Sequence, residues 1–213
     1  MKIFAGNEKI KLWIFNSPPK LQVLTNKEKY TLKNLKGLRA KRFSNSRTFI
    51  RESLSYFFNI EPLKIPLISP ENRPPFLDGN LGNISLSYSK EIFIFGWSQT
   101  KIGLDIEHYK RKVNYELLIK KILNNKEHDS FYKSESQFNN LFLKYWVVKE
   151  AIFKHQQKSN LLNSRNWTWE IDSNIAFNDT TKTFLNIHQE RFKDWEIAIA
   201  SDNISLNFPF VCY

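Results

Sequence analysis

The sequence predicts an α+β protein built from two similar subdomains that meet near residue 100. Three observations favour this class. Segments of alternating apolar and polar residues flank one or two helix-like segments in each half of the chain. These strands and helices lack the regular βαβ alternation that is typical of a parallel sheet. With 213 residues, of which 41% are apolar, the chain is long enough to bury a substantial core.

In the first half we expect a strand pair, two helices, a loop and a β-hairpin. The second helix has Asn45 or Ser46 as its expected N-cap, and the loop holds five of the eight prolines. The expected ranges are 2–15 for the strand pair, 26–42 and 44–58 for the helices, 62–75 for the loop and 84–97 for the hairpin.

In the second half we expect a strand, two helices and three further strands. A polar connection joins the helices. The expected ranges are 102–107 for the first strand, 114–123 and 141–156 for the helices, 124–138 for the connection, and 167–171, 183–189 and 195–201 for the later strands. We place the N-terminal α+β subdomain at residues 1–101 and the C-terminal one at residues 102–213.

The chain is strongly basic, with 32 basic and 21 acidic residues and a net charge of +11. Such a charge indicates a negative partner: nucleic acid, an anionic membrane, a polyphosphate ligand or an acidic protein. The simplest interpretation of each basic cluster is a solvated helix face. One cluster lies on a segment where Leu32, Leu35 and Leu38 recur as on an amphipathic helix. The clusters are Lys33, Lys36, Arg39, Lys41 and Arg42, and then Lys110, Arg111, Lys112, Lys120 and Lys121.

Neither a membrane span nor a secretory signal is expected. No stretch approaches about 18 uninterrupted apolar residues, and the first eight residues are too polar for a signal peptide. We therefore expect a cytoplasmic protein. The single cysteine, Cys212, excludes an internal disulfide framework and a cysteine-based zinc cluster, and we expect no role for it.

Two carboxylates lie in the strand that follows the hairpin. Ile102, Leu104 and Ile106 alternate with Gly103, Asp105 and Glu107. The apolar residues should therefore face a core, while Asp105 and Glu107 project from the other face about 6–7 Å apart. Two oxygen donors in this arrangement suit one hard cation.

A third carboxylate lies in the helix expected at 141–156. Glu150 shares a stripe with Phe142, Trp146 and Phe153, where a lone charge is costly unless it is paired or coordinates a metal. Lys154, at the i+4 position, could pair with it, and for an isolated helix this is the simpler interpretation. Glu150 is thus either one half of a surface pair or a third metal ligand.

The two acidic fragments together resemble 4'-phosphopantetheinyl transferases of the Sfp type. Residues 103–107 (GLDIE) match that family's G-[VI]-D-[VIL]-E at every position but Leu104, and residues 146–154 (WVVKEAIFK) match its W-x-x-K-E-[AS]-x-x-K. Upstream, residues 44–49 resemble the family's early helix with a coenzyme-contacting arginine, 72–74 its G-K-P turn and 84–89 its S-x-S-H-S strand. The resemblance covers about residues 40 to 155.

The resemblance implies a fold of two pseudo-dimeric halves and an enzyme that moves 4'-phosphopantetheine from coenzyme A to a serine of an apo carrier protein. Adenosine 3',5'-bisphosphate is the other product, and Mg²⁺ is the cofactor. Carriers of this kind are acidic acyl or peptidyl carrier proteins of fatty-acid, polyketide or nonribosomal-peptide synthesis. The basic clusters would then steer the carrier, and a monomer would suffice.

The resemblance also implies roles for individual residues. Mg²⁺ suits an all-oxygen ligand set, and phosphoryl transfer needs cations on the phosphates and a base for the serine proton. The implied metal ligands are Asp105, Glu107 and Glu150. The implied catalytic residues are Glu150, as the base, and Lys154. The implied coenzyme-binding residues are Arg47, Arg73, Ser87, Tyr88, Lys149 and Lys154.

The chain departs from the family pattern at three further places. Tyr88 stands where a histidine is usual, so that a phenol replaces a group that can carry a positive charge, and we expect weaker coenzyme binding. Arg73 replaces the usual lysine. Residues 155–160 contain none of the glycine that often follows the second motif.

Two other classes of function stay open. The positive charge, the aromatic residues and the carboxylates also suit a basic nucleic-acid-binding protein or a metal-dependent nuclease, although no recognised nucleic-acid motif supports this. A non-catalytic member of the same fold that binds carrier proteins is the other alternative. The intact acidic motifs favour the transferase over both.

Overall fold

The computed structural model describes residues 10–70, 73–111, 115–133, 138–157 and 165–202. The helices are α1 (Asn26–Lys33), α2 (Gly37–Phe58), α3 (Tyr115–Ile122), α4 (Asn125–Lys133), α5 (Phe138–Gln156) and the short 3₁₀ helix η1 (Pro62–Lys64). The strands are β1 (Ile10–Phe15), β2 (Leu67–Ile68), β3 (Phe76–Leu77), β4 (Asn83–Ser89), β5 (Ile92–Ser98), β6 (Ile102–His108), β7 (Trp167–Trp169), β8 (Ile175–Asn178), β9 (Thr183–Phe192) and β10 (Trp195–Ser201).

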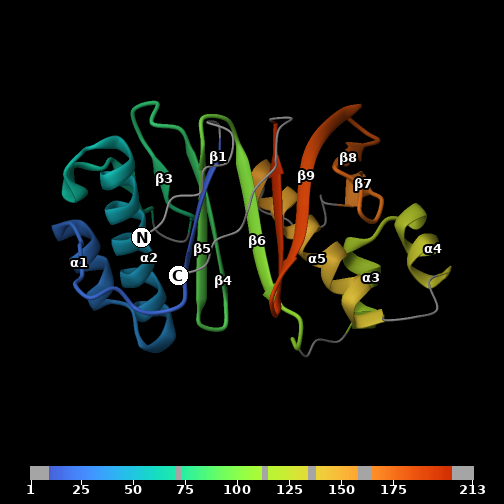
Figure 1. The fold of residues 1–213 in the computed structure, drawn as a ribbon, viewed down its shortest axis with the longest axis horizontal. Coiled ribbons are helices and arrows are strands. Elements are labelled where there is room, and N and C mark those ends of the chain that lie inside the picture. Colours follow the sequence, from blue (N-terminus) through green and yellow to red (C-terminus); the bar gives the residue numbers. More distant parts are fainter. Residues whose placement is uncertain (1–9, 71–72, 112–114, 134–137, 158–164, 203–213) are drawn as a thin grey trace.

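Two antiparallel sheets have the same order at their cores. The first is β1-β5-β4 and the second is β6-β10-β9-β8-β7. In each half the opening strand pairs with the closing strand, which in turn pairs with the strand before it. Figure 1 shows the sheets side by side, with α1 and α2 on one flank and α3 and α4 on the other. The predicted α+β class, with antiparallel sheets packed with helices, is confirmed.

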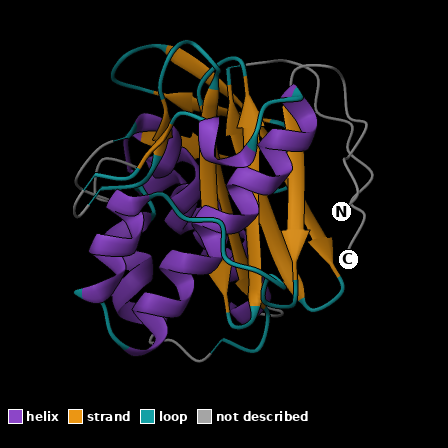
Figure 2. Ribbon diagram, turned by 90° about the vertical axis from the view of Figure 1, so that its left-hand side faces the viewer, coloured by secondary structure: helices purple, strands orange, loops and turns teal. Residues whose placement is uncertain are grey.

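Three apolar clusters hold these layers together. One cluster joins the aromatic residues of α2 and the first sheet, and a second joins α3, α4 and α5 to the second sheet. The third consists of residues from β1, β5, β6 and β10, and so belongs to both halves. Each sheet therefore packs a helix on one face and the other half of the chain on the opposite face. Figure 2 shows the strands running lengthwise with helices packed along them. The boundary at residues 101 and 102 falls between β5 and β6 and stays a prediction.

Helix α5 approaches β6 closely at Gly103. A Cβ built there would overlap the Ala151 carbonyl oxygen of α5. The helix can lie against the strand only because this position has no side chain, and a small residue faces it. The glycine of the first acidic motif thus brings the second motif next to it.

The break between the first two helices differs from the prediction. The expected helices met at residue 43, whereas α1 ends at Lys33 and α2 begins at Gly37, where φ is +54°. The leucines at i+3 spacing therefore belong to two helices and to the break between them, and Leu38 is 62% exposed. The predicted N-cap was also wrong. Lys36 is the N-cap of α2, and Ser46 lies inside the helix, where its hydroxyl donates to the Phe43 carbonyl.

The expected connection at 124–138 contains a helix that was not predicted. Asn124 and Glu127 form a reciprocal capping box at the start of α4, each side chain accepting the other residue's backbone N–H at 3.0 Å. The many polar residues there obscured this start signal. Strand β8 was also missed, because its four residues are too few to show a convincing alternation. In addition, part of the strand pair expected at 2–15 lies outside the described residues, which include only β1.

Candidate active site

The candidate site lies where β4 meets β6, the seam between the two sheets. Three serines of β4, at alternate positions, point towards β6. Ser85 Oγ accepts the backbone N–H of Leu104 at 2.9 Å, and Ser89 Oγ accepts that of His108 at 2.9 Å. Along this edge of β6, serine hydroxyls therefore accept the backbone N–H groups that the carbonyl groups of a neighbouring strand would accept in a continuous sheet. The alternation Ser85-Ser87-Ser89 was visible in the sequence as one face of a strand.

Asp105 lies at the centre of the seam and is only 4% exposed. Its Oδ1 accepts hydrogen bonds from Ser87 Oγ at 2.7 Å and from Lys154 Nζ at 2.8 Å. Its Oδ2 is buried and has no hydrogen-bond partner within the described chain. A buried carboxylate oxygen without a donor is costly, so this oxygen is suited to a cation or a proton.

Lys154 connects the two sheets and α5. Its ammonium donates to Asp105 Oδ1, to the Leu104 carbonyl at 3.0 Å and to the Leu86 carbonyl at 3.3 Å. These three acceptors match the three protons of an ammonium group. They come from β4 and β6, while the lysine comes from α5. Lys154 therefore pairs with Asp105 in the structure, not with Glu150 as the isolated helix would suggest.

Glu150 lies one helical turn before Lys154 and is half-buried. The pKa of its carboxyl is raised to about 7, mainly by burial and then by the negative charge of Asp105, while Lys154 and Arg111 oppose both effects. The coupling to Asp105 means that the two carboxylates from the two acidic motifs lie in one electrostatic environment. A group with such a pKa can accept a proton near neutral pH.

Glu107 lies on the same face of β6 as Asp105, as predicted from the alternation. Its Oε1 forms an ion pair with the Arg111 guanidinium, and its Oε2 accepts a hydrogen bond from Ser89 Oγ at 3.2 Å. Both oxygens are therefore in use. Arg111 was expected among surface basic residues, and its position beside the carboxylates was not predicted.

The carboxylates present fit a divalent cation in their chemistry. Asp105 has an unpartnered buried oxygen, and its charge disfavours ionisation of Glu150, so a cation between them would relieve both. An all-carboxylate donor set suits Mg²⁺ better than a transition metal. In the described ranges, no three Asp, Glu, His or Cys side chains lie close enough together to hold an ion. This is consistent with the ion pair between Glu107 and Arg111, which engages one of the three predicted ligands.

Lys149 lies outside this cluster, although it adjoins Glu150 in the sequence. It is completely buried and forms an ion pair with Glu127 Oε1 at 2.7 Å, and its ammonium also donates to the Trp167 carbonyl. Burial lowers the pKa of Lys149 and raises that of Glu127, while each charge partly offsets the effect on the other. Because Glu127 Oε1 also accepts the Trp169 N–H at 2.9 Å, the pair ties α4, α5 and β7 together. These contacts of Lys149 lie within the protein, so its role in binding coenzyme stays a prediction.

Tyr88 lies on the other face of β4, away from Asp105 and towards α2. Its hydroxyl donates to the Arg42 carbonyl at 2.8 Å, its ring stacks on Phe93, and the Arg42 guanidinium lies 5.1 Å from the ring centroid. Burial raises the pKa of Tyr88 to about 12. Tyr88 is therefore neutral. The positive charge that a histidine would bring at this position comes instead from the Arg42 guanidinium beside its ring.

A cavity of about 300 Å³ lies beside Tyr88. It is lined by aromatic residues, by three cations and by one carboxylate, Glu91, so the cavity is positive on balance and suits an anionic ligand with a flat apolar part. The lining includes Phe49, Tyr88 and Phe93 together with Lys41, Arg42 and Lys90. Of these residues only Tyr88 was predicted to bind coenzyme; Arg42 and Lys41 had been grouped with the basic helix face.

The two predicted coenzyme-binding arginines lie in different surroundings. Arg47 is buried on α2, where its Nε donates to Ser69 Oγ at 2.7 Å and its guanidinium lies 4.6 Å from the Phe43 ring centroid. Burial lowers the pKa of Arg47 to about 10. Arg73 is exposed on the loop that leads into β3. No described contact joins either arginine to the carboxylate cluster, and their roles stay predictions.

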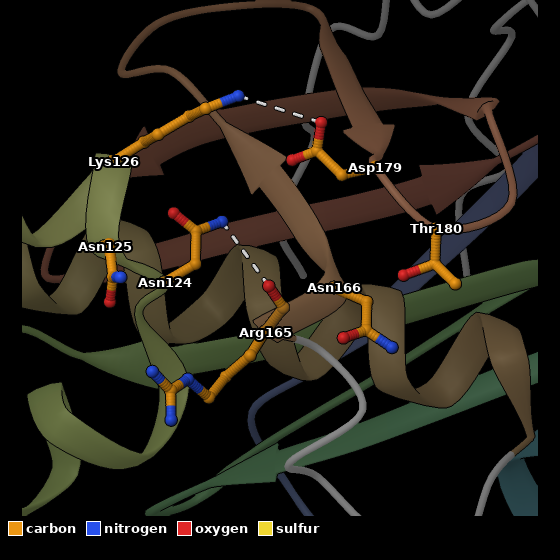
Figure 3. Close-up of a pocket in the computed structure, with 7 residues that line it drawn as sticks. All are labelled: Asn124, Asn125, Lys126, Arg165, Asn166, Asp179 and Thr180. Carbon is orange, nitrogen blue, oxygen red and sulfur yellow. Dashed lines mark hydrogen bonds and ion pairs between the residues drawn. The ribbon is translucent and has the colours of Figure 1, made fainter.

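The larger cavity, about 570 Å³, lies elsewhere, between the start of α4 and the ends of β7 and β8 (Figure 3). Its lining is polar and contains none of the predicted site residues. The lining residues are Asn124, Asn125, Lys126, Arg165, Asn166, Asp179 and Thr180. The chemistry of the carboxylates therefore locates the candidate site better than cavity size does.

The second half of the chain is similar to a known protein family. Residues 101–202 match the family model described as the 4'-phosphopantetheinyl transferase superfamily. No curated protein matches the chain. None of the helices in the described part of the chain is both long and apolar enough to cross a membrane. The matched segment, which is similar to this superfamily of transferases, holds all three candidate metal ligands together with Lys154.

Proposed function

We propose that the protein is an Sfp-type transferase that moves the 4'-phosphopantetheine group of coenzyme A to a serine of an apo acyl or peptidyl carrier protein. The observation that carries the proposal is the meeting of Asp105, Glu150 and Lys154 at one seam, from a strand and a helix that both lie in the matched segment. A buried carboxylate with a free oxygen, a proton acceptor and an ammonium group are the parts that phosphoryl transfer requires.

In this reaction the serine oxygen of the carrier bonds to the phosphorus that bears the pantetheine, and the bond to the bridging pyrophosphate oxygen breaks. Adenosine 3',5'-bisphosphate leaves with that oxygen. Glu150 accepts the serine proton, directly or through a bound water. Lys154, already held at the seam by three acceptors, supplies positive charge to the phosphates.

We assign Mg²⁺ as the metal ion and Asp105, Glu107 and Glu150 as its ligands. When bound, the metal would neutralise the pyrophosphate oxygens and the charge that builds up on the leaving group. Asp105 would contribute its unpartnered Oδ2, and Ser87 would hold the other oxygen in place. Glu107 would join in competition with its ion pair to Arg111.

We assign the coenzyme's nucleotide to the basic and aromatic cavity beside Tyr88, with Arg47 and Arg73 as further phosphate contacts. Three cations against one carboxylate, Glu91, leave this cavity positive, and its aromatic wall matches the flat base of a phosphorylated nucleoside. The carrier protein is acidic in this proposal, and exposed lysines such as Lys110, Lys120 and Lys121 steer it towards the seam. We place the protein in the cytoplasm. It acts as a monomer, because one chain supplies both sides of the seam.

The test is a mass measurement on apo carrier proteins incubated with the protein, coenzyme A and Mg²⁺. The expected result is a gain of one phosphopantetheine on the carrier serine, which is lost with Glu150→Gln and with chelation of the metal. Glu116→Gln, which removes an exposed carboxylate of α3, is the matched control and should keep the activity.

Two results would contradict the proposal. No mass gain on a panel of acidic acyl and peptidyl carriers, with carrier binding intact, would instead favour a non-catalytic carrier-binding protein. Tight, salt-sensitive binding of random DNA without binding of coenzyme A would favour the nucleic-acid class.

A further inference from the structure

Arg111 is fixed at the edge of the candidate site by the turn that follows β6. Its backbone N–H donates to the His108 carbonyl at 2.9 Å, which closes a tight turn. The neighbouring Tyr109 N–H donates to the Asp194 carbonyl at 2.9 Å, which anchors the turn to the β9–β10 connection. The guanidinium therefore returns over the end of the strand that carries the carboxylates.

The Arg111 side chain meets three groups of the site at once. It forms the ion pair with Glu107, its guanidinium lies 5.1 Å from the ring centroid of Trp146, and its charge lowers the pKa of Glu150. Trp146 lies on α5, one helical turn before Glu150. The arginine is thus held from two sides, by a carboxylate of β6 and by an aromatic face of α5.

This arrangement makes Glu107 different from the other two carboxylates. Asp105 keeps a buried oxygen without a donor, whereas Glu107 gives one oxygen to Arg111 and the other to Ser89. A divalent cation at Glu107 therefore competes with these partners for the carboxylate oxygens. Of the two, the ion pair is the more readily exchanged, because the Arg111 side chain is 36% exposed and such pairs are weak in water.

We propose that Arg111 is an exchangeable counter-ion of Glu107. When a divalent cation binds Glu107, it replaces the Arg111 guanidinium as the partner of that carboxylate. The released guanidinium then binds a phosphate group of the coenzyme. The second half of this inference rests on the proposed function. Trp146 keeps the guanidinium at the site after the exchange, because the interaction with the aromatic face does not depend on Glu107. A guanidinium without a carboxylate partner is a strong bidentate ligand for phosphate.

The inference predicts opposite effects of one substitution on two ligands. Removing Arg111 removes the competitor for Glu107, so the metal should bind more tightly. The same substitution removes a phosphate ligand, so coenzyme A should bind more weakly. A surface ion pair with a purely structural role would move neither affinity.

The experiment titrates the full-length free protein with MgCl₂ by calorimetry, without coenzyme, and then titrates the metal-saturated protein with coenzyme A. For Arg111→Ala we expect a Kd for Mg²⁺ about threefold to fivefold lower than in the wild type. We expect a Kd for coenzyme A about tenfold higher. Arg111→Lys should recover part of the coenzyme affinity, since it keeps the charge but loses the planar fork.

Arg191→Ala is the matched control. Its guanidinium lies 4.9 Å from the Tyr109 ring centroid, so it is also an arginine stacked on an aromatic ring near the end of β6, but it is not the counter-ion of Glu107. It should change neither Kd by more than about twofold. Thermal unfolding of each variant confirms that it is folded.

The failures can be told apart. If the wild type binds Mg²⁺ and Arg111→Ala binds it no more tightly, the exchange is refuted, whatever the activity on carrier proteins. If the metal affinity rises but coenzyme A affinity is unchanged, the phosphate role is refuted. If the wild type transfers phosphopantetheine but its free form binds no Mg²⁺ at millimolar concentration, the exchange fails while the proposed transfer stands.

Discussion

Gly103 lies so close to Ala151 that a Cβ at the glycine would overlap the alanine carbonyl oxygen. This contact joins the two acidic motifs, because Asp105 follows Gly103 by two residues on β6 and Glu150 precedes Ala151 on α5. Without it, the carboxylates of the two motifs could not share one site. The glycine of the first motif is therefore a packing requirement with a direct consequence for chemistry.

Gly103→Ala should destabilise the protein by at least about 3 kcal/mol, because the added carbon meets backbone that cannot move without shifting α5. Urea denaturation of the purified variant measures this. Gly96→Ala is the control, since its Cβ would meet only the ends of the Leu12 and Ile102 side chains, and it should cost about 1 kcal/mol. Equal losses in the two variants would disprove the close approach of the helix.

Lys149→Met should destabilise the protein by about 3–5 kcal/mol, because it leaves the buried Glu127 carboxylate without its counter-charge. The double variant with Glu127→Gln should lose less, since no buried charge then remains. Both are measured by urea denaturation. Lys144→Met, which removes an exposed pair with Asp172, should cost no more than about 1 kcal/mol. A similar small loss for Lys149→Met would mean that the buried pair does not hold α4 against α5.

Glu150 should make the metal-free protein less stable as the pH rises. Its pKa is about 7 in the folded state and 4.5 as the ordinary value, so the folded protein binds the proton more tightly. The stabilisation is complete below pH 4.5 and is lost as the pH rises through about 7, for a total of about 3 kcal/mol. The free-energy difference between wild type and Glu150→Gln, measured from pH 4 to pH 8, isolates this group. A difference that does not change with pH would contradict the raised pKa.

Tyr88→Phe should cost about 1 kcal/mol of stability, because it removes the hydrogen bond to the Arg42 carbonyl. The affinity for coenzyme A should stay within about twofold, since the hydroxyl is already used within the protein. Denaturation and calorimetry give the two values, with Tyr56→Phe, an exposed tyrosine of α2, as the control. A large loss of coenzyme affinity would show that the hydroxyl leaves Arg42 to bind phosphate. Tyr88→His tests the weaker coenzyme binding expected from the sequence, and no gain in affinity would count against it.

The sequence was most informative where chemistry and periodicity coincide. The alternation around Asp105 correctly predicted a strand with Asp105 and Glu107 on one face, and the hairpin before it was also correct. The start of α2 and the presence of α4 were not predicted. In the first case a glycine with positive φ outweighed an i+3 pattern, and in the second a capping box was hidden among polar residues.

Charge pairing could not be predicted in the same way. An i+4 spacing suggested that Lys154 pairs with Glu150, but the ammonium is held by Asp105 and two carbonyl groups that are distant in sequence. Lys149 and Arg111 were both expected to meet external partners. The structure pairs them instead with Glu127 and Glu107. Lys149 and Lys154 find their partners on other elements, which no local pattern contains, whereas Arg111 pairs with Glu107 only four residues before it, across the turn after β6.

By itself, then, the sequence determined which residue types are available and on which face of a strand or helix they lie, because backbone geometry imposes periods of 2 and 3.6 on any chain. Only the tertiary structure decided which of these residues meet. It did so through one close contact at Gly103, which brings α5 onto β6, and through the serine seam that joins the two sheets. The carboxylates are a property of the sequence, whereas the site they form, with Lys154 within it and Arg111 at its edge, is a property of the packing.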